Sequence, residues 1–258
     1  MKVALISDLH SNREALEAVF DHIRAQGIDR IFCLGDIVGY GAEPEFCVDL
    51  VRGHAEVSLM GNHDDALFHG GADFNPHARV AIDFTRARLS PRWYSGSERK
   101  ARWKWLQNLD FTYREGRFLF VHGSPRDHVN EYVYREDVFF NAEGKLKEIF
   151  ARVDRVLFVG HTHLPTVIGD NLKTFVPTDK TLPNGQLEYD AGETTRATLR
   201  FSAIDSEARL DIVVAKDSAV LLPITDVTVT VCIGSSISMF RRDALFVNER
   251  RARIAWSS

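Results

Sequence analysis

The chain opens with the sequence VALISDLH at residues 3–10, a short apolar run that ends in an aspartate and a histidine two positions apart. A run of this length followed by a turn predicts a buried strand over residues 3–7. Residues 12–26 then carry apolar side chains at every third or fourth position, which predicts an amphipathic helix that stops at Gly27. A strand followed directly by a helix is the pattern from which α/β folds are built.

Four further apolar runs in the first 160 residues end in the same way, in a turn that contains glycine together with aspartate, asparagine or histidine. The runs and their turns are 30–34 with 35–39, 56–60 with 61–64, 117–121 with 122–125, and 155–159 with 160–163. In an open α/β sheet, ligands bind in the crevice beyond the carboxyl ends of the strands. We therefore expect five strand ends to place their polar side chains around one cleft.

Capping and turn residues mark the elements between these runs. Asn75 followed by Pro76 predicts a capped helix that continues to about residue 89. Ser97 is expected to cap the next helix, and residues 115–116 to turn a hairpin. A further helix is expected over residues 142–150.

Composition and charge limit the classes of function. Of the 258 residues, 45% are hydrophobic and 26% are charged, as in average soluble domains, which excludes a disordered chain, a fibre and a coiled-coil rod. The chain has 36 acidic and 32 basic residues, so its net charge is negative. We therefore do not expect a protein that binds nucleic acid mainly through the phosphates. No apolar run is long enough for a signal peptide or a membrane span, and three scattered cysteines without C-x-x-C spacing predict a cytoplasmic protein.

The polar side chains at the strand ends have the chemistry of metal ligands. Positions 8 and 10, like 161 and 163, are two apart, so each pair points to the same side of an extended backbone. Imidazole, carboxylate and amide oxygen without thiolate suit divalent Mn, Fe, Zn or Ni. Because seven ligands are too many for one tetrahedral ion, two ions that share a bridging carboxylate are expected. The seven candidates are Asp8, His10, Asp36, Asn62, His122, His161 and His163.

In this order, the motifs Asp-x-His, Gly-Asp-x-x-Gly, Gly-Asn-His-Asp, His-Gly and Gly-His-x-His resemble those of the calcineurin-like metallophosphoesterase superfamily, over roughly residues 1–168. Longer stretches at 34–41, 74–79 with 85–90, and 121–127 with 131–132 resemble its compact bacterial and archaeal branch of stand-alone phosphoesterases. The resemblance implies an α/β fold of four layers, an α-β-β-α sandwich.

The resemblance also implies a role for each candidate ligand. One ion would be held by Asp8, His10 and His163, the other by Asn62, His122 and His161, with Asp36 bridging the two.

Four further roles concern the substrate. His63 would face it, stabilising the phosphoryl group or protonating the leaving oxygen, and Asp64 would orient that imidazole. Asn62 is a candidate substrate contact as well as a ligand. Arg126 is a candidate phosphate contact, with an ordinary ion pair to a neighbouring acid as the alternative.

The expected function is metal-dependent hydrolysis of a phosphate ester, either a phosphodiester or a small phosphorylated metabolite. Two ions about 3.5–4 Å apart would activate a hydroxide, and manganese is the ion expected to support activity. Two divalent ions, two carboxylates and one hydroxide leave a net charge of about +1, which favours an anionic substrate.

Alternatives on the same site are a protein serine/threonine phosphatase and a nucleotide pyrophosphatase. An alternative of another class is a non-catalytic scaffold on the same fold. The expected partner is a small phosphate ester rather than a nucleic acid or a membrane, and a homo-oligomer is left open.

The likeness ends after residue 165, and the chain becomes rich in short predicted strands, at 195–204, 209–214, 219–222 and 227–233. We expect a metallophosphoesterase core over 1–168 and a β-rich C-terminal part over 169–258 that completes or extends the sandwich. The nearest counterpart of the family's closing Asn-x-Gly-Ser motif is 232–235, which lacks the asparagine.

Overall fold

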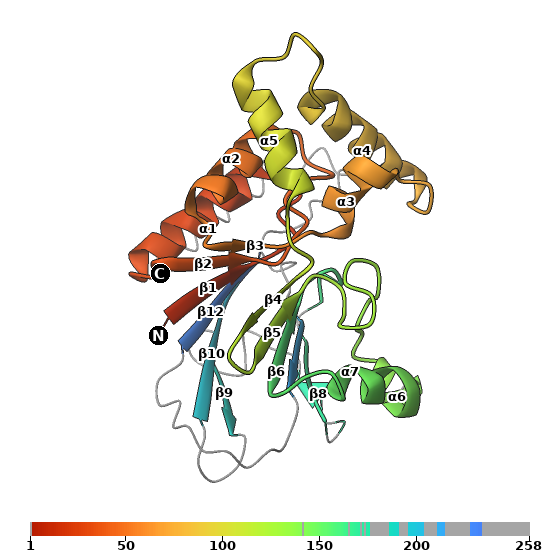
Figure 1. The fold of residues 1–258 in the computed structure, drawn as a ribbon. Helices are drawn as coiled ribbons and strands as arrows, with labels where there is room; N and C mark the ends of the chain where they lie inside the picture. The colour runs from red at the N-terminus through yellow and green to blue at the C-terminus, as the bar shows by residue number, and fades with distance from the viewer. Residues whose placement is uncertain are drawn as a thin grey trace, which may run out of the picture.

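The computed structural model describes residues 2–140, 142–164, 166–170, 172 and 174–175, and the backbone of the strands at 186–190, 196–203, 211–214 and 228–233. Its described strands form two six-stranded sheets (Figure 1). The first has the order β3 (Val57–Ser58), β2 (Arg30–Cys33), β1 (Lys2–Ile6), β12 (Thr228–Ile233), β10 (Arg196–Ala203) and β9 (Gln186–Asp190). The second has the order β4 (Thr112–Glu115), β5 (Phe118–Val121), β6 (Val156–Val159), β11 (Asp211–Val214), β7 (Thr166–Gly169) and β8 (Thr174–Phe175).

Strands that carry the predicted site run parallel within each sheet. In the first sheet β1 is parallel to β2, and β2 to β3, so their carboxyl ends lie at one edge. In the second sheet β5 is parallel to β6. The turns that follow these five strands are the turns in which sequence placed the candidate ligands.

Alternation of buried side chains shows that the two sheets face each other. In β1, Ala4 and Ile6 belong to the cluster formed with the helices of the first sheet. The ring of Phe32 in β2 points the other way and meets Phe120 of β5 and Tyr113 of β4, with ring centroids 5.3 Å apart in both pairs. Aromatic edge-to-face contacts therefore fill the space between the sheets.

Helices cover the outer face of each sheet and complete four layers. Helices α1 (Arg13–Ala25) and α2 (Pro44–His54) lie against the first sheet, whereas α6 (Asp137–Phe140) and α7 (Lys147–Phe150) lie on the far side of the second (Figure 1). The remaining helices, α3 (Asn62–His69), α4 (Pro76–Leu89) and α5 (Ser97–Gln107), stand beyond the end of β3. The predicted four-layer α/β architecture is confirmed.

Capping explains where two of these helices begin. The side-chain oxygen of Asn12 accepts a hydrogen bond from the backbone of Ala15 at 3.1 Å, and that of Asn75 accepts one from Ala78 at 2.9 Å. The predicted cap at Asn75 is confirmed. The prediction for Ser97 is wrong by one residue, because Gly96 caps α5 and Ser97 is its first residue.

Local predictions elsewhere hold in outline. The hairpin of β4 and β5 turns at residues 116–117, where Gly116 has a φ of 57°. The expected helix over 142–150 consists of a π-helical turn, Ala142–Leu146, followed by α7.

Strands from the last third of the chain lie inside both sheets. β12 is parallel to both β1 and β10 and lies between them, and β11 lies between β6 and β7. Of the four strands predicted there, 219–222 lies outside the described residues, as does the end of the 232–235 motif. The division of the chain at residue 168 stays a prediction.

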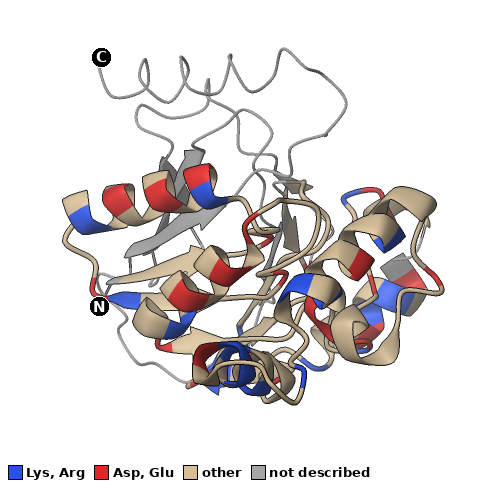
Figure 2. Cartoon of the chain, turned by 90° about the horizontal axis from the view of Figure 1, so that it is seen from above, with Lys and Arg blue, Asp and Glu red and all other residues tan. Residues whose placement is uncertain are grey.

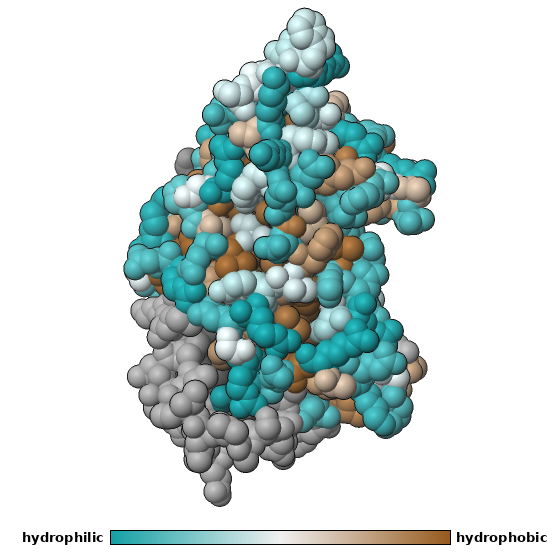
Figure 3. Space-filling model, in the orientation of Figure 1, coloured by the Kyte–Doolittle hydropathy of each residue, from teal (hydrophilic) through white to brown (hydrophobic). Residues whose placement is uncertain are grey.

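Charged side chains are carried mainly by the outer layers. Figure 2 shows acidic and basic residues interspersed along the outer helices, while the strands that it colours carry few charges. The face seen in Figure 3 is mostly hydrophilic where it is described, with hydrophobic residues gathered across its middle. Over the described part of the chain, no helix combines the length and apolar character needed to cross a membrane.

Candidate metal centre

The turns that follow the strands hold several candidate ligands in an uncommon backbone conformation. Asp8, His10, Asp36, His161 and His163 all have positive φ, between 47° and 73°. Residues other than glycine rarely adopt this left-handed conformation, and they keep it at functional sites where the surroundings enforce it. The sharp turns aim these side chains back across the ends of the sheets.

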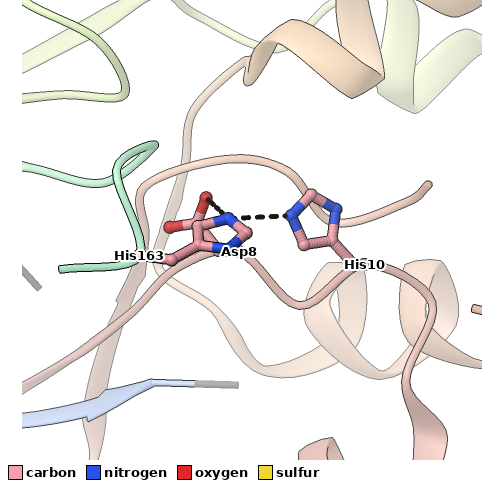
Figure 4. Close-up of side chains that lie close together, drawn as sticks. All are labelled: Asp8, His10 and His163. Carbon is pink, nitrogen blue, oxygen red and sulfur yellow. Dashed lines mark hydrogen bonds and ion pairs between the residues drawn. The ribbon is translucent and has the colours of Figure 1, made fainter. Parts of the chain in front are cut away.

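One set of ligands consists of Asp8, His10 and His163, whose side chains point toward one another (Figure 4). The Nε2 atom of His163 lies 3.1 Å from Oδ1 of Asp8 and 3.2 Å from Nε2 of His10. Asp8 and His10 follow β1 in the first sheet, whereas His163 follows β6 in the second. The set therefore joins the two sheets.

A second set consists of Asp36, His122 and His161, with Asn62 beside it. The Oδ2 atom of Asp36 lies 3.4 Å from Nε2 of His122, and the amide oxygen of Asn62 lies 3.3 Å from the same nitrogen. That Asp36 oxygen is also 3.7 Å from Nε2 of His10, a member of the first set. Asp36 thus lies between the two sets, as expected for a bridging carboxylate, and all seven candidate ligands come together.

Backbone carbonyls fix which nitrogen of three imidazoles carries the proton. The Nδ1 of His10 donates to the carbonyl of Val38 at 3.3 Å, and the Nδ1 of His122 donates to that of Leu34 at 3.0 Å. The Nε2 of His161 donates to the carbonyl of Asn130 at 3.3 Å. Because a carbonyl only accepts hydrogen bonds, the other nitrogen of each ring is the one that can bind a cation when it is unprotonated.

Burial and charge set the protonation of these histidines. Burial lowers the pKa of His10 to about 3 and that of His161 to about 4, in spite of the nearby carboxylates. Burial also acts to lower the pKa of His122, but the adjacent Asp36 raises it to about 9. Without a metal ion, the proton on His122 balances part of the carboxylate charge.

The donor set fits divalent metal ions. Burial acts to raise the pKa of Asp8 and Asp36, yet the histidines that face them, His163 and His122, hold it below the usual value. Ionised carboxylates and imidazoles that bind as neutral rings, without thiolate, are ligands for Mn, Fe, Zn or Ni, and His122 would give up its proton on binding. Five of the candidate ligands are buried: Asp8, His10, Asp36, His122 and His161. Among the described residues, three overlapping groups could each hold such an ion: the two sets above, and a third group of His10, Asp36 and His63.

His63 lies beside both sets. Its backbone N–H donates to Oδ1 of Asp36 at 2.8 Å, and its ring packs against those of His10, Tyr40 and Phe74, at centroid distances of 4.8, 4.6 and 5.0 Å. The Nδ1 atom is buried and has no hydrogen-bond partner. A side chain at Gly39 would place its Cβ 2.5 Å from that nitrogen, so only glycine leaves room for the imidazole.

Asp64 has different partners from those expected of it. Its Oδ1 accepts a hydrogen bond from the backbone of Val38 at 3.1 Å, and its Oδ2 accepts from Ile37 at 3.3 Å and Gly61 at 3.1 Å. Neither oxygen contacts the His63 imidazole, because Asp64 is the third residue of α3 and its side chain reaches back to the start of the helix. The carboxylate ties the turn after β2 to the turn after β3.

Arg126 is engaged in ion pairs. Its guanidinium lies 3.1 Å from a carboxylate oxygen of Glu131 and 3.0 Å from one of Glu148. The structure thus has the ion-pair arrangement, and a contact between Arg126 and a phosphate stays a prediction.

Tyr132 is a neighbour of the centre that spacing arguments missed. Its ring stacks on His161 with centroids 3.8 Å apart and an interplanar angle of 19°. Tyr132 lies in the irregular segment between β5 and α6, where no periodicity relates it to the ligands. The one feature of the sequence that pointed to Tyr132 is its position next to Glu131, in a stretch that resembles the calcineurin-like metallophosphoesterases.

Comparison with known proteins agrees with this geometry. A family model described as calcineurin-like phosphoesterase matches residues 1–199. The chain belongs to the calcineurin-like phosphoesterase family. This phosphoesterase match extends beyond residue 168, into the β-rich part.

Two relatives of this calcineurin-like phosphoesterase illustrate the likeness. An uncharacterized protein of Methanocaldococcus jannaschii is 37% identical over 172 residues, which cover 64% of this chain and 63% of that protein. The crystal structure of a metallophosphoesterase from Sphaerobacter thermophilus is 33% identical, with a TM-score of 0.56, and the match covers 82% of this chain and 74% of that one. The predicted resemblance is confirmed, and the chain spans somewhat less than two thirds of the length of its curated relative.

Proposed function

We propose that this protein is a metal-dependent hydrolase of phosphate esters, and that phosphodiesters are its preferred substrates. The observation that carries the proposal is the position of Asp36, within 3.4 Å of His122 in one ligand set and 3.7 Å of His10 in the other. A shared carboxylate between two sets of imidazole and carboxylate ligands is the arrangement needed for a pair of divalent ions.

The ligand residues and His63 would have different roles in hydrolysis. A bound pair of divalent ions would supply an activated water and hold oxygens of the phosphoryl group. In hydrolysis the water oxygen attacks phosphorus, the ester P–O bond breaks, and the leaving oxygen takes a proton. His63 stands next to Asp36 with Nδ1 against Gly39, so Nε2 is the nitrogen left to donate a hydrogen bond to a phosphoryl oxygen.

Charge near the centre favours a diester over a monoester. The largest influences on the pKa of Asp8 and Asp36 are burial and neighbouring histidines and aspartates, and no lysine or arginine is among them. Arg126 is already paired with two glutamates. A phosphate monoester carries close to two negative charges at neutral pH, because its second pKa is about 6. A diester carries one, which matches a centre with a net charge of about +1.

The test is hydrolysis of bis-p-nitrophenyl phosphate and p-nitrophenyl phosphate with added Mn. We expect the diester to have the higher kcat/KM, and His63→Ala to lower kcat about 100- to 1,000-fold, as does loss of one donor to transition-state charge elsewhere. Asp36→Asn should abolish activity together with binding of one or both ions. The matched control is His69→Ala, an exposed histidine paired with Asp65 on the same helix.

Two results would contradict the proposal. Metal binding without turnover of either ester, or of a broader phosphate panel, would favour the non-catalytic scaffold. A monoester preference would overturn the choice of substrate and favour a phosphatase on the same site.

A further inference from the structure

The connection between α4 and α5 displays two aromatic side chains to solvent. Trp93 is 90% exposed and Tyr94 is 60% exposed, and their rings meet edge to face with centroids 5.4 Å apart. Figure 1 shows this connection at the top of the molecule, beyond the ends of both helices. Trp103 and Trp105 of α5, by contrast, pack partly buried against the core cluster of the first sheet. Packing within the described part of the chain therefore accounts for these two tryptophans but not for Trp93.

The charge of this part of the chain is opposite in sign to that of the whole. Residues 76–107, which form α4, the connection and α5, contain eight basic and two acidic residues and have a net charge of +6, whereas the whole chain has −4. Glu45 and Asp49 of α2 neutralise part of this charge. They pair with Arg88 and Arg102, respectively. The remaining excess of positive charge attracts anionic partners.

Three basic groups of the connection and the first turn of α5 contact neutral partners. Arg92 donates to the hydroxyl oxygen of Tyr94 at 2.7 Å. Arg99 donates to a backbone carbonyl of α4 at 2.5 Å, and the Lys100 ammonium donates to the carbonyl of Trp93 at 3.5 Å. Among the described residues, no carboxylate pairs with any of the three, so their charge is available to a partner.

Charge and ring geometry narrow the choice of partner. A second copy of the chain is disfavoured, because a symmetric contact would bring two positively charged surfaces together. Single-stranded nucleic acids bind on aromatic platforms on which bases stack, whereas Trp93 and Tyr94 meet edge to face and form no such platform. Tryptophan and tyrosine side chains gather at the headgroup level of membranes, where anionic lipids also attract adjacent basic groups.

We propose that the α4–α5 connection is a docking surface for an anionic lipid membrane. Trp93 and Tyr94 enter the headgroup region, and the three basic groups contact lipid phosphates. The sequence predicted no membrane partner because it contains no membrane span, but docking at the surface of a bilayer needs none. The inference goes beyond the proposed hydrolysis and does not depend on it.

The test measures co-flotation of the full chain with vesicles of phosphatidylcholine alone and with vesicles that also contain about 30% phosphatidylglycerol. We expect the wild type to bind the anionic vesicles at least about tenfold more tightly, and to lose this preference as salt screens the attraction. Arg92→Gln and Lys100→Gln should each weaken binding about fivefold. Trp93→Ala should weaken it about tenfold, because an aromatic side chain no longer leaves water.

A second readout reports insertion of the ring itself. Bromine on the acyl chains of phosphatidylcholine quenches the fluorescence of a tryptophan that enters the bilayer. The wild type should be quenched on anionic vesicles that contain this lipid. Trp93→Phe keeps an aromatic ring, so it should still float with the vesicles but lose most of the quenching.

Two variants on the other side of the molecule are the controls. Lys147→Gln removes an exposed lysine that pairs with Glu143 at 3.6 Å, and Phe139→Ala removes an aromatic side chain of α6 that is 72% exposed. Neither should change binding to vesicles.

Four results would overturn the inference. Equal or absent binding to the two kinds of vesicle would exclude an anionic membrane as the partner, and binding that survives Trp93→Ala and both charge variants would place the contact elsewhere. A dimer in sedimentation velocity that Trp93→Ala dissociates would assign the surface to a second copy of the chain. Displacement of the vesicles by a single-stranded oligonucleotide, with loss of oligonucleotide binding in Trp93→Ala, would assign it to nucleic acid.

Discussion

Replacement of Asp64 gives the sharpest test of how the centre is held together. Its buried carboxylate accepts three backbone hydrogen bonds, from Ile37, Val38 and Gly61. Each buried N–H left without a partner costs about 1–3 kcal/mol. Asp64→Ala should therefore lower the free energy of unfolding by about 4 kcal/mol, near the lower end of the sum for three such groups. Asp64→Asn, which keeps one accepting oxygen, should lower it by about 2 kcal/mol.

The assay is urea denaturation of the metal-free protein at pH 8. Burial and the nearby Asp36 raise the pKa of Asp64 to about 7, so the ionised carboxyl opposes folding at pH 8. Removal of this charge offsets part of the loss in both variants, and the two figures are therefore upper limits. The matched control is Asp65→Asn at the next position, where the carboxylate pairs with the exposed His69 at 2.8 Å. A surface pair of this kind contributes about 0–1 kcal/mol, so the control should unfold close to the wild type.

One pattern of results would give Asp64 a different role. If Asp64→Asn unfolds like the wild type while its kcat changes and its pH profile shifts, the carboxylate acts on the His63 imidazole. The backbone hydrogen bonds would then contribute little, and the role implied by family resemblance would be the correct one.

Two other predictions follow from contacts at the centre. Gly61→Ala should abolish binding of at least one metal ion, because its Cβ would overlap the backbone nitrogen and a carboxylate oxygen of Asp36. The control is Gly53→Ala in α2, where a Cβ would meet no atom within 4 Å. Manganese titration of both variants is the measurement. Because the pKa of His122 is raised to about 9, metal binding at pH 7.5 should displace its proton. Calorimetry in two buffers of different ionisation enthalpy should then show at least one proton released per chain, and no release would mean that His122 is already neutral and that no bound water loses a proton.

Sequence was a good guide to local structure and to which candidate ligands lie together. Apolar runs and caps such as Asn75 depend on neighbouring residues alone, so the first strands and helices could be predicted. Turns at the carboxyl ends of parallel strands converge by geometry, which is why seven candidate ligands from five separate turns could be placed together.

Contacts set by tertiary packing could not be predicted in this way. The position of β11 between β6 and β7 depends on pairing across more than 40 residues, which no local pattern encodes. The partners of Asp64 depend on how closely two turns approach, and sequence spacing does not contain that distance. Tyr132 lies in an irregular loop, so its stacking on His161 became visible only in the structure.

Asp36 lies between the two ligand sets, and we propose that it joins them into one centre for a pair of metal ions. Anomalous diffraction from a crystal soaked in manganese tests it most directly. We expect two peaks about 3.5–4 Å apart, with Asp36 between them, His10 beside one and His122 beside the other. A single peak, or two peaks that do not share Asp36, would contradict it.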